Sequence, residues 1–219
     1  MPGKYICLEG PDYCGKTTTL HNLHNFLRTK EINSTITKHP GATWIGQRIR
    51  EIVKDPDAKV LDHTRAMLFA VDNAAFHEEI AKPMINSKDW LLADRNNFTS
   101  ALAYQMADGV SLDEIQQIHS SLINPRKIDH VFVLDITYET RMQRQRLREA
   151  AEGKVNDYYE RDREHFDKLR NAYARLAENK DALHRYVEHD DDYTLNIHMI
   201  NGNVDGAGIL DQIASKLGF

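Results

Sequence analysis

Short apolar segments alternate with longer amphipathic segments along this chain. The short segments are rich in apolar and β-branched residues, and they predict strands over 4–9, 34–38, 90–94, 130–136 and 195–200. Between them, apolar residues recur every three or four positions, which predicts helices. The expected helices lie within 16–30, 45–53, 64–84, 99–106, 112–122, 138–150, a segment ending near 180, and 204–217.

Strands that alternate with helices favour a parallel sheet, because two parallel neighbours must be joined by a crossover connection. Right-handed crossovers place helices on both faces of such a sheet. The prediction is therefore an α/β fold of the P-loop type, with a five-stranded parallel sheet between two helical layers. A length of 219 residues suits one domain, which we expect over 1–219.

Composition narrows the functional classes. Lys and Arg number 28 and Asp and Glu 33, so the formal net charge of 28 − 33 = −5 argues against a general DNA- or RNA-coating protein. The longest uninterrupted apolar run, 66–71, is far shorter than the roughly 18 residues that cross a bilayer, so we expect no membrane span. The chain starts without the pattern of a secretory signal and has two cysteines, Cys7 and Cys14, which favours a cytoplasmic protein.

A phosphate-binding motif joins the first predicted strand and helix. Residues 10–17, GPDYCGKT, fit G-x-x-x-x-G-K-[ST] in the strand–loop–helix context that this motif requires. The backbone N–H groups of such a loop bind phosphate oxygens together with the helix N-terminus. Lys16 is expected to bridge the β- and γ-phosphates of ATP, and the Thr17 hydroxyl to ligate Mg²⁺. The expected ATP-binding residues are Gly10, Pro11, Asp12, Tyr13, Cys14, Gly15, Lys16, Thr17 and Thr18.

The loop alone leaves a GTPase, an ATPase motor and a small-molecule kinase open. The D-x-x-G and N-K-x-D motifs of a switch GTPase are absent from their expected places in the sequence. Instead, the third predicted strand ends in Asp94-Arg95, a carboxylate beside a guanidinium at the sheet edge where ligands of α/β folds bind. Asp94 and Thr17 are the expected magnesium ligands, and a structural Asp94–Arg95 ion pair is the alternative.

Further motifs follow the loop in order. After EGPDYCGKTT at 9–18 come KHPGAT at 38–43 with GQRIR at 46–50, LFAVDN at 68–73, DR at 94–95 with SALAYQ at 100–105, and the arginines Arg144, Arg146 and Arg148. This series resembles the thymidylate kinase family of P-loop nucleoside monophosphate kinases. The resemblance implies transfer of the ATP γ-phosphoryl group to the 5′-phosphate of a deoxynucleoside monophosphate. It also implies a homodimer.

For catalysis, the resemblance implies five cationic residues. ATP and the nucleoside monophosphate are both polyanions and must be brought together, so fixed cations are the main catalytic requirement. Here Lys16 would bind ATP and Arg95 would bind the acceptor phosphate. Three arginines would form a lid within about 141–157. Alternate positions lie about 200° apart around a helix, so the three cannot all share one face. The five implied catalytic residues are Lys16, Arg95, Arg144, Arg146 and Arg148.

For the acceptor, the resemblance implies three specific contacts. Asp12 would accept a hydrogen bond from the deoxyribose 3′-OH, Phe69 would stack on the base, and Tyr104 would exclude a ribose 2′-OH. Core packing is an equal interpretation of Phe69, because it lies in an apolar helical run. The implied acceptor-binding residues are Asp12, Lys38, Pro40, Phe69, Asn73, Arg95, Ser100, Ala101, Tyr104 and Gln105.

Some positions depart from the family pattern. Asn73 stands where the family has an arginine that reads the base carbonyl, and Ala101 stands where it has a polar residue. We therefore expect the acceptor to be dTMP, a 5-substituted deoxyuridylate or a broader set of pyrimidine deoxynucleotides. Tyr13 stands where one branch of the family has a catalytic arginine, so the chain resembles the branch whose lid supplies that charge.

Two other functions are compatible with the sequence. A kinase of the same fold could phosphorylate the hydroxyl of a deoxynucleoside or of a modified base, although Asp94-Arg95 stands where a nucleoside kinase has a glutamate–arginine pair. A catalytically silent nucleotide-binding regulator would keep the loop but could lose the acceptor residues. The retained Arg95 and Tyr104 argue against the regulator.

Overall fold

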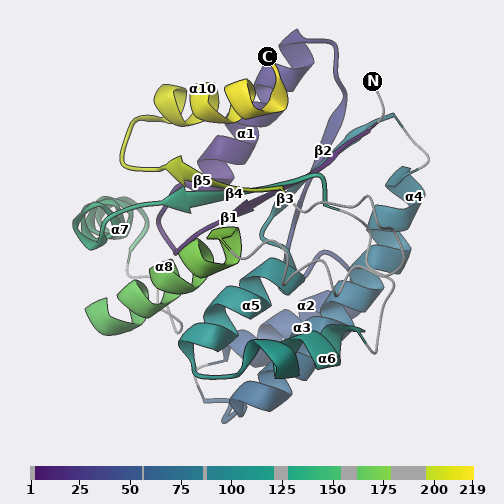
Figure 1. The fold of residues 1–219 in the computed structure, drawn as a ribbon, viewed down its shortest axis with the longest axis vertical. Helices are drawn as coiled ribbons and strands as arrows, with labels where there is room; N and C mark the ends of the chain where they lie inside the picture. Colours follow the sequence, from purple (N-terminus) through teal and green to yellow (C-terminus); the bar gives the residue numbers. More distant parts are fainter. Residues whose placement is uncertain (1–2, 56, 86–87, 121–127, 154–161, 179–195) are drawn as a thin grey trace.

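A computed structural model describes residues 3–55, 57–85, 88–120, 128–153, 162–178 and 196–219 (Figure 1). Within them, one sheet contains β1 (Tyr5–Glu9), β2 (Ser34–Lys38), β3 (Trp90–Asp94), β4 (His130–Asp135) and β5 (Asn196–Asn201). The strand order is β2-β3-β1-β4-β5, and each neighbouring pair is parallel. The expected five-stranded parallel sheet is confirmed.

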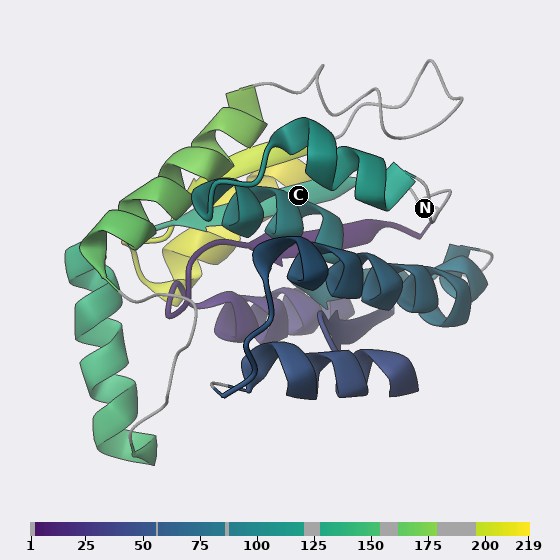
Figure 2. The same ribbon diagram turned by 90° about the horizontal axis from the view of Figure 1, so that it is seen from below.

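Helices cover both faces of this sheet (Figures 1 and 2). Helices α1 and α10 pack together on one face, whereas α5 and α8 lie side by side on the other, with α2, α3 and α6 beyond α5. Among the described helices, none is long and apolar enough to cross a bilayer. The helices are α1 (Lys16–Thr29), α2 (Trp44–Lys54), α3 (Asp62–Phe76), α4 (Lys82–Ile85), α5 (Asn97–Ala107), α6 (Leu112–Ser120), α7 (Tyr138–Glu152), α8 (Arg163–Glu178) and α10 (Gly206–Leu217).

The central strand β1 is buried on both faces and separates two cores. Ile6 and Leu8 belong to the same cluster as Leu20 of α1. Tyr5, which points to the opposite face, belongs to the same cluster as Tyr173 of α8. Because side chains alternate along a strand, a strand covered by helices on both sides reads as a continuous apolar run. That burial fixes the end of β1, from which the phosphate loop leaves the sheet.

The helix expected over 64–84 is interrupted. Helix α3 ends at Phe76, a π-helical turn η1 (His77–Ala81) follows, and α4 continues from Lys82. Pro83 has no N–H to donate to the carbonyl of Glu79, and its ring crowds that carbonyl, so a regular α-helical ladder cannot run through this segment. The predicted helical segment over 64–84 is therefore present, and the structure adds the π-helical turn that divides it into three consecutive segments.

Helices α2 and α3 meet at a glycine. A Cβ on Gly46 would lie 2.0 Å from Oδ1 of Asp72, a buried carboxylate that also accepts a hydrogen bond from the Gly41 N–H at 3.3 Å. Gly46→Ala should lower the free energy of unfolding by about 2–4 kcal/mol, because α2 must shift or Asp72 must turn away. Urea unfolding followed by circular dichroism measures the change. Gln47→Ala, at an exposed neighbouring position, should change it by less than about 0.5 kcal/mol, and equal losses in both variants would contradict the role of the close contact.

Candidate active site

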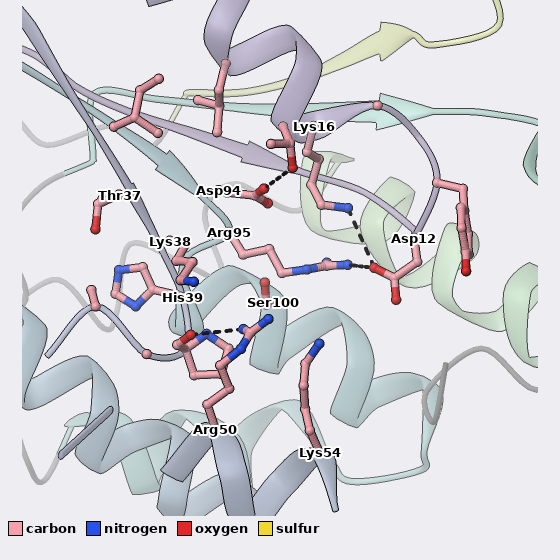
Figure 3. Close-up of a pocket in the computed structure, with 18 of the residues that line it drawn as sticks. Asp12, Lys16, Thr37, Lys38, His39, Arg50, Lys54, Asp94, Arg95 and Ser100 are labelled. Carbon is pink, nitrogen blue, oxygen red and sulfur yellow. Dashed lines mark hydrogen bonds and ion pairs between the residues drawn. The ribbon is translucent and has the colours of Figure 1, made fainter. Parts of the chain in front are cut away.

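A cavity of about 900 Å³ opens at the C-terminal ends of β1, β2 and β3 (Figure 3). The phosphate loop and α7 line one side of it, and the β2–α2 connection with α2, α3 and α5 lines the other. The cavity therefore lies at the sheet edge where ligands of parallel α/β folds bind. The predicted site residues that line it are Asp12, Tyr13, Gly15, Lys16, Thr17, Thr18, Lys38, Pro40, Phe69, Asp94, Arg95, Ser100, Tyr104, Arg144 and Arg148.

The phosphate loop wraps tightly around its lysine. Gly10 and Gly15 have φ values of +129° and +100°, and a Cβ on Gly10 would lie 2.7 Å from the Leu134 carbonyl oxygen, so glycine is required there. Lys16 begins α1, and its ammonium donates to the carbonyls of Gly10 at 3.0 Å and Pro11 at 2.9 Å. The ammonium is thereby held against the loop whose amides and helix N-terminus favour phosphate.

Thr17 and Asp94 come together beside this loop. The Thr17 hydroxyl donates to Oδ2 of Asp94 at 2.8 Å, although 77 positions separate the two residues. Magnesium keeps several waters and takes one or two protein oxygens together with substrate phosphates, so this hydroxyl and carboxylate fit it. Among the residues that the structure describes, no group of three or more His, Cys, Asp or Glu side chains could hold a metal ion. A magnesium ion here would therefore depend on the phosphates of a nucleotide.

Arg95 lies in the middle of the cavity and has an unusual backbone. Its φ of +69° is in the left-handed region, which costs a residue with a Cβ about 1–2 kcal/mol. The guanidinium donates to the Gly10 carbonyl at 3.0 Å and the Tyr104 hydroxyl at 2.9 Å, and it pairs with Asp12 (Figure 3). Burial alone would lower the pKa of Arg95, but the groups around it, led by Tyr104 and Asp12, raise that pKa well above its usual value. Arg95 thus combines a strained backbone with a guanidinium that stays positively charged.

A buried carboxylate, Glu9, lies behind Arg95. Its Oε2 is 3.8 Å from the Arg95 guanidinium. Glu9 accepts hydrogen bonds at 2.8 Å each from the Ser100 hydroxyl, the Asn96 backbone N–H and the Tyr173 hydroxyl. The motif at 9–18 includes Glu9 but assigns it no role, and no spacing along α8 singles out Tyr173, 164 positions away.

The opposite wall carries two cations that were not predicted as site residues. Arg50 and Lys54 extend from one face of α2 into the cavity, and Arg50 donates to the Pro40 carbonyl at 3.0 Å (Figure 3). The motif at 46–50 contains Arg50, but the sequence does not distinguish it from Arg48, which is exposed and pairs with Glu51. Helical spacing of Arg50 and Lys54, four residues apart, was the available signal.

Among the described residues implied to contact the base, Phe69 lines the cavity and Asn73 does not. Phe69 is half-buried on α3 and lines the cavity, so its ring can meet a ligand while it packs within the fold. Asn73, one turn further along α3, is buried and is not among the cavity-lining residues. The side chains of Ala101 and Gln105 lie outside the described part of the structure.

Known proteins match the chain over most of its length. The family model for thymidylate kinase matches residues 8–190. The chain belongs to the thymidylate kinase family. A thymidylate kinase of Halothermothrix orenii is 33% identical over 182 residues, which are 82% of this chain and 86% of that protein. A thymidylate kinase of Pseudomonas fluorescens is 32% identical over 193 residues, which are 87% of this chain and 88% of that protein.

A solved structure supports the same architecture. The crystal structure of thymidylate kinase from Ehrlichia chaffeensis aligns with a TM-score of 0.71 over 99% of both chains, at 18% identity. At that identity the likeness shows the fold. Membership of the thymidylate kinase family makes this chain an ATP-dependent nucleoside monophosphate kinase, as the order of its motifs implied.

Two of the three alternate arginines of α7 line the cavity of this thymidylate kinase family member. Arg144 and Arg148 do so, and Arg144 donates to the Cys14 carbonyl at 2.8 Å. Arg146 is exposed and does not line it. The division follows from helix geometry, because positions four apart share a face and the position between them points away. Residues 154–157 of the expected lid lie outside the described residues.

Proposed function

We propose that this chain transfers the γ-phosphoryl group of ATP to the 5′-phosphate of dTMP, giving ADP and dTDP. An oxygen of the acceptor phosphate attacks the γ-phosphorus, and the bond from that phosphorus to the β,γ-bridging oxygen breaks, so its electron pair leaves with ADP. The observation that carries the proposal is Arg95, a largely buried cation between the phosphate loop and the α2–α3 wall of one cavity. Membership of the thymidylate kinase family supports the same reaction.

Charge neutralisation is the main task of the residues that line the cavity. Lys16 would bind the β- and γ-phosphates of ATP, and Arg95 and Arg50 would hold the acceptor phosphate from two sides. Magnesium held by Thr17 and Asp94 would neutralise the phosphates of the nucleotide. The acceptor phosphate is largely ionised at neutral pH, since its second pKa is about 6, so no protein base is required.

The arginines of α7 would add charge from the open side. The phosphate loop carries Tyr13 rather than an arginine, and Arg144 and Arg148 line the cavity from α7. We propose that they act as a lid within about 141–157. The hydrogen bond from Arg144 to the Cys14 carbonyl supports this role, because it anchors α7 to the loop that binds the transferred group.

Three residues would select the acceptor through its 3′-OH, its base and its 2′ position. Asp12 would accept a hydrogen bond from the 3′-OH, Phe69 would stack on the base, and Tyr104 would leave no room for a 2′-OH. Asn73 is a short amide where the family has arginine, so at least one polar contact to the base is weakened or lost, worth about 1 kcal/mol. We therefore propose that 5-substituted deoxyuridylates are accepted alongside dTMP.

We also propose a homodimer and a cytoplasmic location, which surface and thiol chemistry support. Exposed apolar residues on α2 and α3, Ile52 at 45%, Met67 at 54% and Val71 at 42%, support a homodimer formed through these helices. Cys7 and Cys14 are buried and form no disulfide, which supports a reducing compartment such as the cytoplasm.

A panel of acceptors tests the proposal. Purified protein is incubated with Mg²⁺, γ-labelled ATP and, separately, dTMP, 5-bromo-dUMP, dUMP, dCMP, UMP or thymidine, and the labelled products are separated. We expect transfer to dTMP, with 5-bromo-dUMP within about tenfold of it in kcat/KM and UMP at least about a hundredfold below it. Protein carrying Lys16→Met, prepared in parallel, measures any contaminating host kinase.

The outcomes separate the candidate functions. Phosphorylation of thymidine but not of dTMP would contradict a phosphate acceptor. Exclusive use of dTMP would contradict the altered base pocket while leaving the enzyme class intact. ATP binding without transfer to any acceptor would favour a catalytically silent protein.

A further inference from the structure

The buried carboxylate behind Arg95 has no part in the phosphate chemistry proposed above. Glu9 ends β1, is fully buried and does not line the cavity. Its two oxygens accept hydrogen bonds from the Asn96 N–H, from the Ser100 hydroxyl, which reaches both oxygens, and from the Tyr173 hydroxyl. A buried carboxylate bound by several donors in fixed directions is locked in one orientation.

Tyr173 supplies the donor that comes from outside the site. It lies on α8, is 2% exposed, and its hydroxyl is 2.8 Å from Oε2 of Glu9. Burial, and then the negative charge of Glu9, raise the pKa of Tyr173 well above its usual value, so the hydroxyl stays protonated and donates. Helix α8 is thereby connected to the end of β1 below the cavity.

The orientation of Glu9 bears directly on Arg95. Oε2, the same oxygen that Tyr173 holds, is 3.8 Å from the Arg95 guanidinium, close enough for strong attraction but not for a hydrogen bond. Asp12 pairs with the same guanidinium from the open side and is 28% exposed. Arg95 is therefore held between a solvent-facing carboxylate and a buried one.

We propose that Tyr173 is a positioning residue that acts through Glu9 to hold the Arg95 guanidinium at the distance needed to bind the acceptor phosphate. The inference rests on the proposed role of Arg95 in binding that phosphate. Without the Tyr173 hydroxyl, Oε2 of Glu9 lacks one donor and completes its hydrogen bonding with the nearest cation. Arg95 is then drawn back from the cavity, toward the sheet.

Tyr173→Phe removes only the hydroxyl and is the direct test. We expect kcat/KM for dTMP to fall about tenfold, with the KM for ATP within twofold of wild type, because a single hydrogen bond to a charged group is lost. The matched control is Tyr5→Phe, since Tyr5 is equally buried and its hydroxyl accepts a hydrogen bond from the Asn96 side chain. Tyr5→Phe should leave both constants within twofold. Melting temperatures of both variants report on the fold.

A double-mutant cycle distinguishes positioning from general destabilisation. In an Arg95→Lys background, Tyr173→Phe should lower kcat/KM less than twofold further, because the group that it positions is already gone. Equal tenfold losses in both backgrounds would overturn the proposal, as would an unchanged kcat/KM in the single variant. Glu9→Gln tests the same interaction by removing the charge of the carboxylate, and it should give the same selective loss of kcat/KM for dTMP. It replaces Tyr173→Phe as the test if that variant does not fold.

A readout that is independent of activity separates this inference from the proposed function. In ¹⁵N NMR spectra the Nη groups of a pinned guanidinium rotate slowly and give separate signals, which Arg95→Lys assigns. In Tyr173→Phe these signals should shift or merge, whereas Tyr5→Phe should preserve them. Unchanged Arg95 signals would overturn the positioning role even if dTMP is the substrate, and changed signals in a protein without transferase activity would leave that role intact and overturn only the function.

Discussion

Lys16→Met should lower kcat/KM for phosphoryl transfer by at least about a thousandfold while the protein stays folded. The Lys16 side chain is 8% exposed and is fixed by the carbonyls of Gly10 and Pro11, so its charge is already in place when ATP arrives. Without it, the charge that develops on the β,γ-bridging oxygen is not neutralised. Methionine has a similar length and no charge, so the loop keeps its packing and the variant introduces no buried charge without a partner.

A coupled assay of ADP formation measures this loss, and circular dichroism confirms the fold. The matched control is Lys82→Met on α4, where the lysine is 62% exposed and pairs with Glu78. Its rate should change by less than about twofold, because exposed ion pairs contribute little. Full activity in Lys16→Met would exclude the assigned role, and an unfolded Lys16→Met protein would show that the lysine stabilises the loop instead.

The parts of the site that could be predicted from the sequence are those encoded locally. The loop from Gly10 to Thr17 has glycine at two positions of positive φ, Gly10 and Gly15, and a lysine at the start of α1, so the spacing of these residues predicted it; the positive φ of Tyr13 was not predicted. The parallel sheet was predicted from strand-like segments that alternate with helices, and the signal is clearest in β1, β3 and β4, which are apolar runs because helices cover both of their faces. Asp94-Arg95 was found because a charged pair directly after a buried strand lies at the ligand edge.

The residues that sequence reasoning missed depend on tertiary contacts. Glu9 and Tyr173 meet across 164 positions, and each alone has an ordinary explanation as a strand end or a helix residue. Arg50 and Arg48 belong to the same motif on α2, and the packing of α2 beside the cavity shows that Arg50 lines it while Arg48 is exposed. The left-handed backbone of Arg95 also has no sequence signal, since its cause is the geometry at the end of β3.

The net charge of the chain likewise does not predict the charge of the cavity. A formal charge of −5 describes the whole chain, whereas the cavity is lined by cations from α1, β2, α2, α7 and the loop after β3, and by two acidic residues, Asp12 and Asp94. Local arrangement decides what a site attracts, since exposed charges further away than about 10 Å are screened at moderate ionic strength. The cavity-lining cations are Lys16, Lys38, Arg50, Lys54, Arg95, Arg144 and Arg148.

Arg95→Ala should lower kcat/KM for dTMP by about a thousandfold and change the KM for ATP by less than about threefold. The variant loses the cation that we propose binds the acceptor phosphate, and it also leaves the negative charges of Asp12 and buried Glu9 less compensated near that phosphate. Repulsion therefore adds to the lost attraction. Steady-state kinetics with each substrate varied in turn measures both constants. Arg48→Ala, which removes an exposed arginine paired with Glu51, should leave both unchanged.

Arg95→Gly separates the charge from the backbone. At φ +69° alanine keeps the left-handed strain, whereas glycine relieves it, so the glycine variant should be about 1 kcal/mol more stable than the alanine variant. Because both lack the guanidinium, their kcat/KM for dTMP should be equally low. If activity instead followed stability, with Arg95→Gly well above Arg95→Ala, the residue would matter for the shape of the loop rather than for phosphate binding. Equal loss at unequal stability is the result that the buried, doubly paired guanidinium leads us to expect.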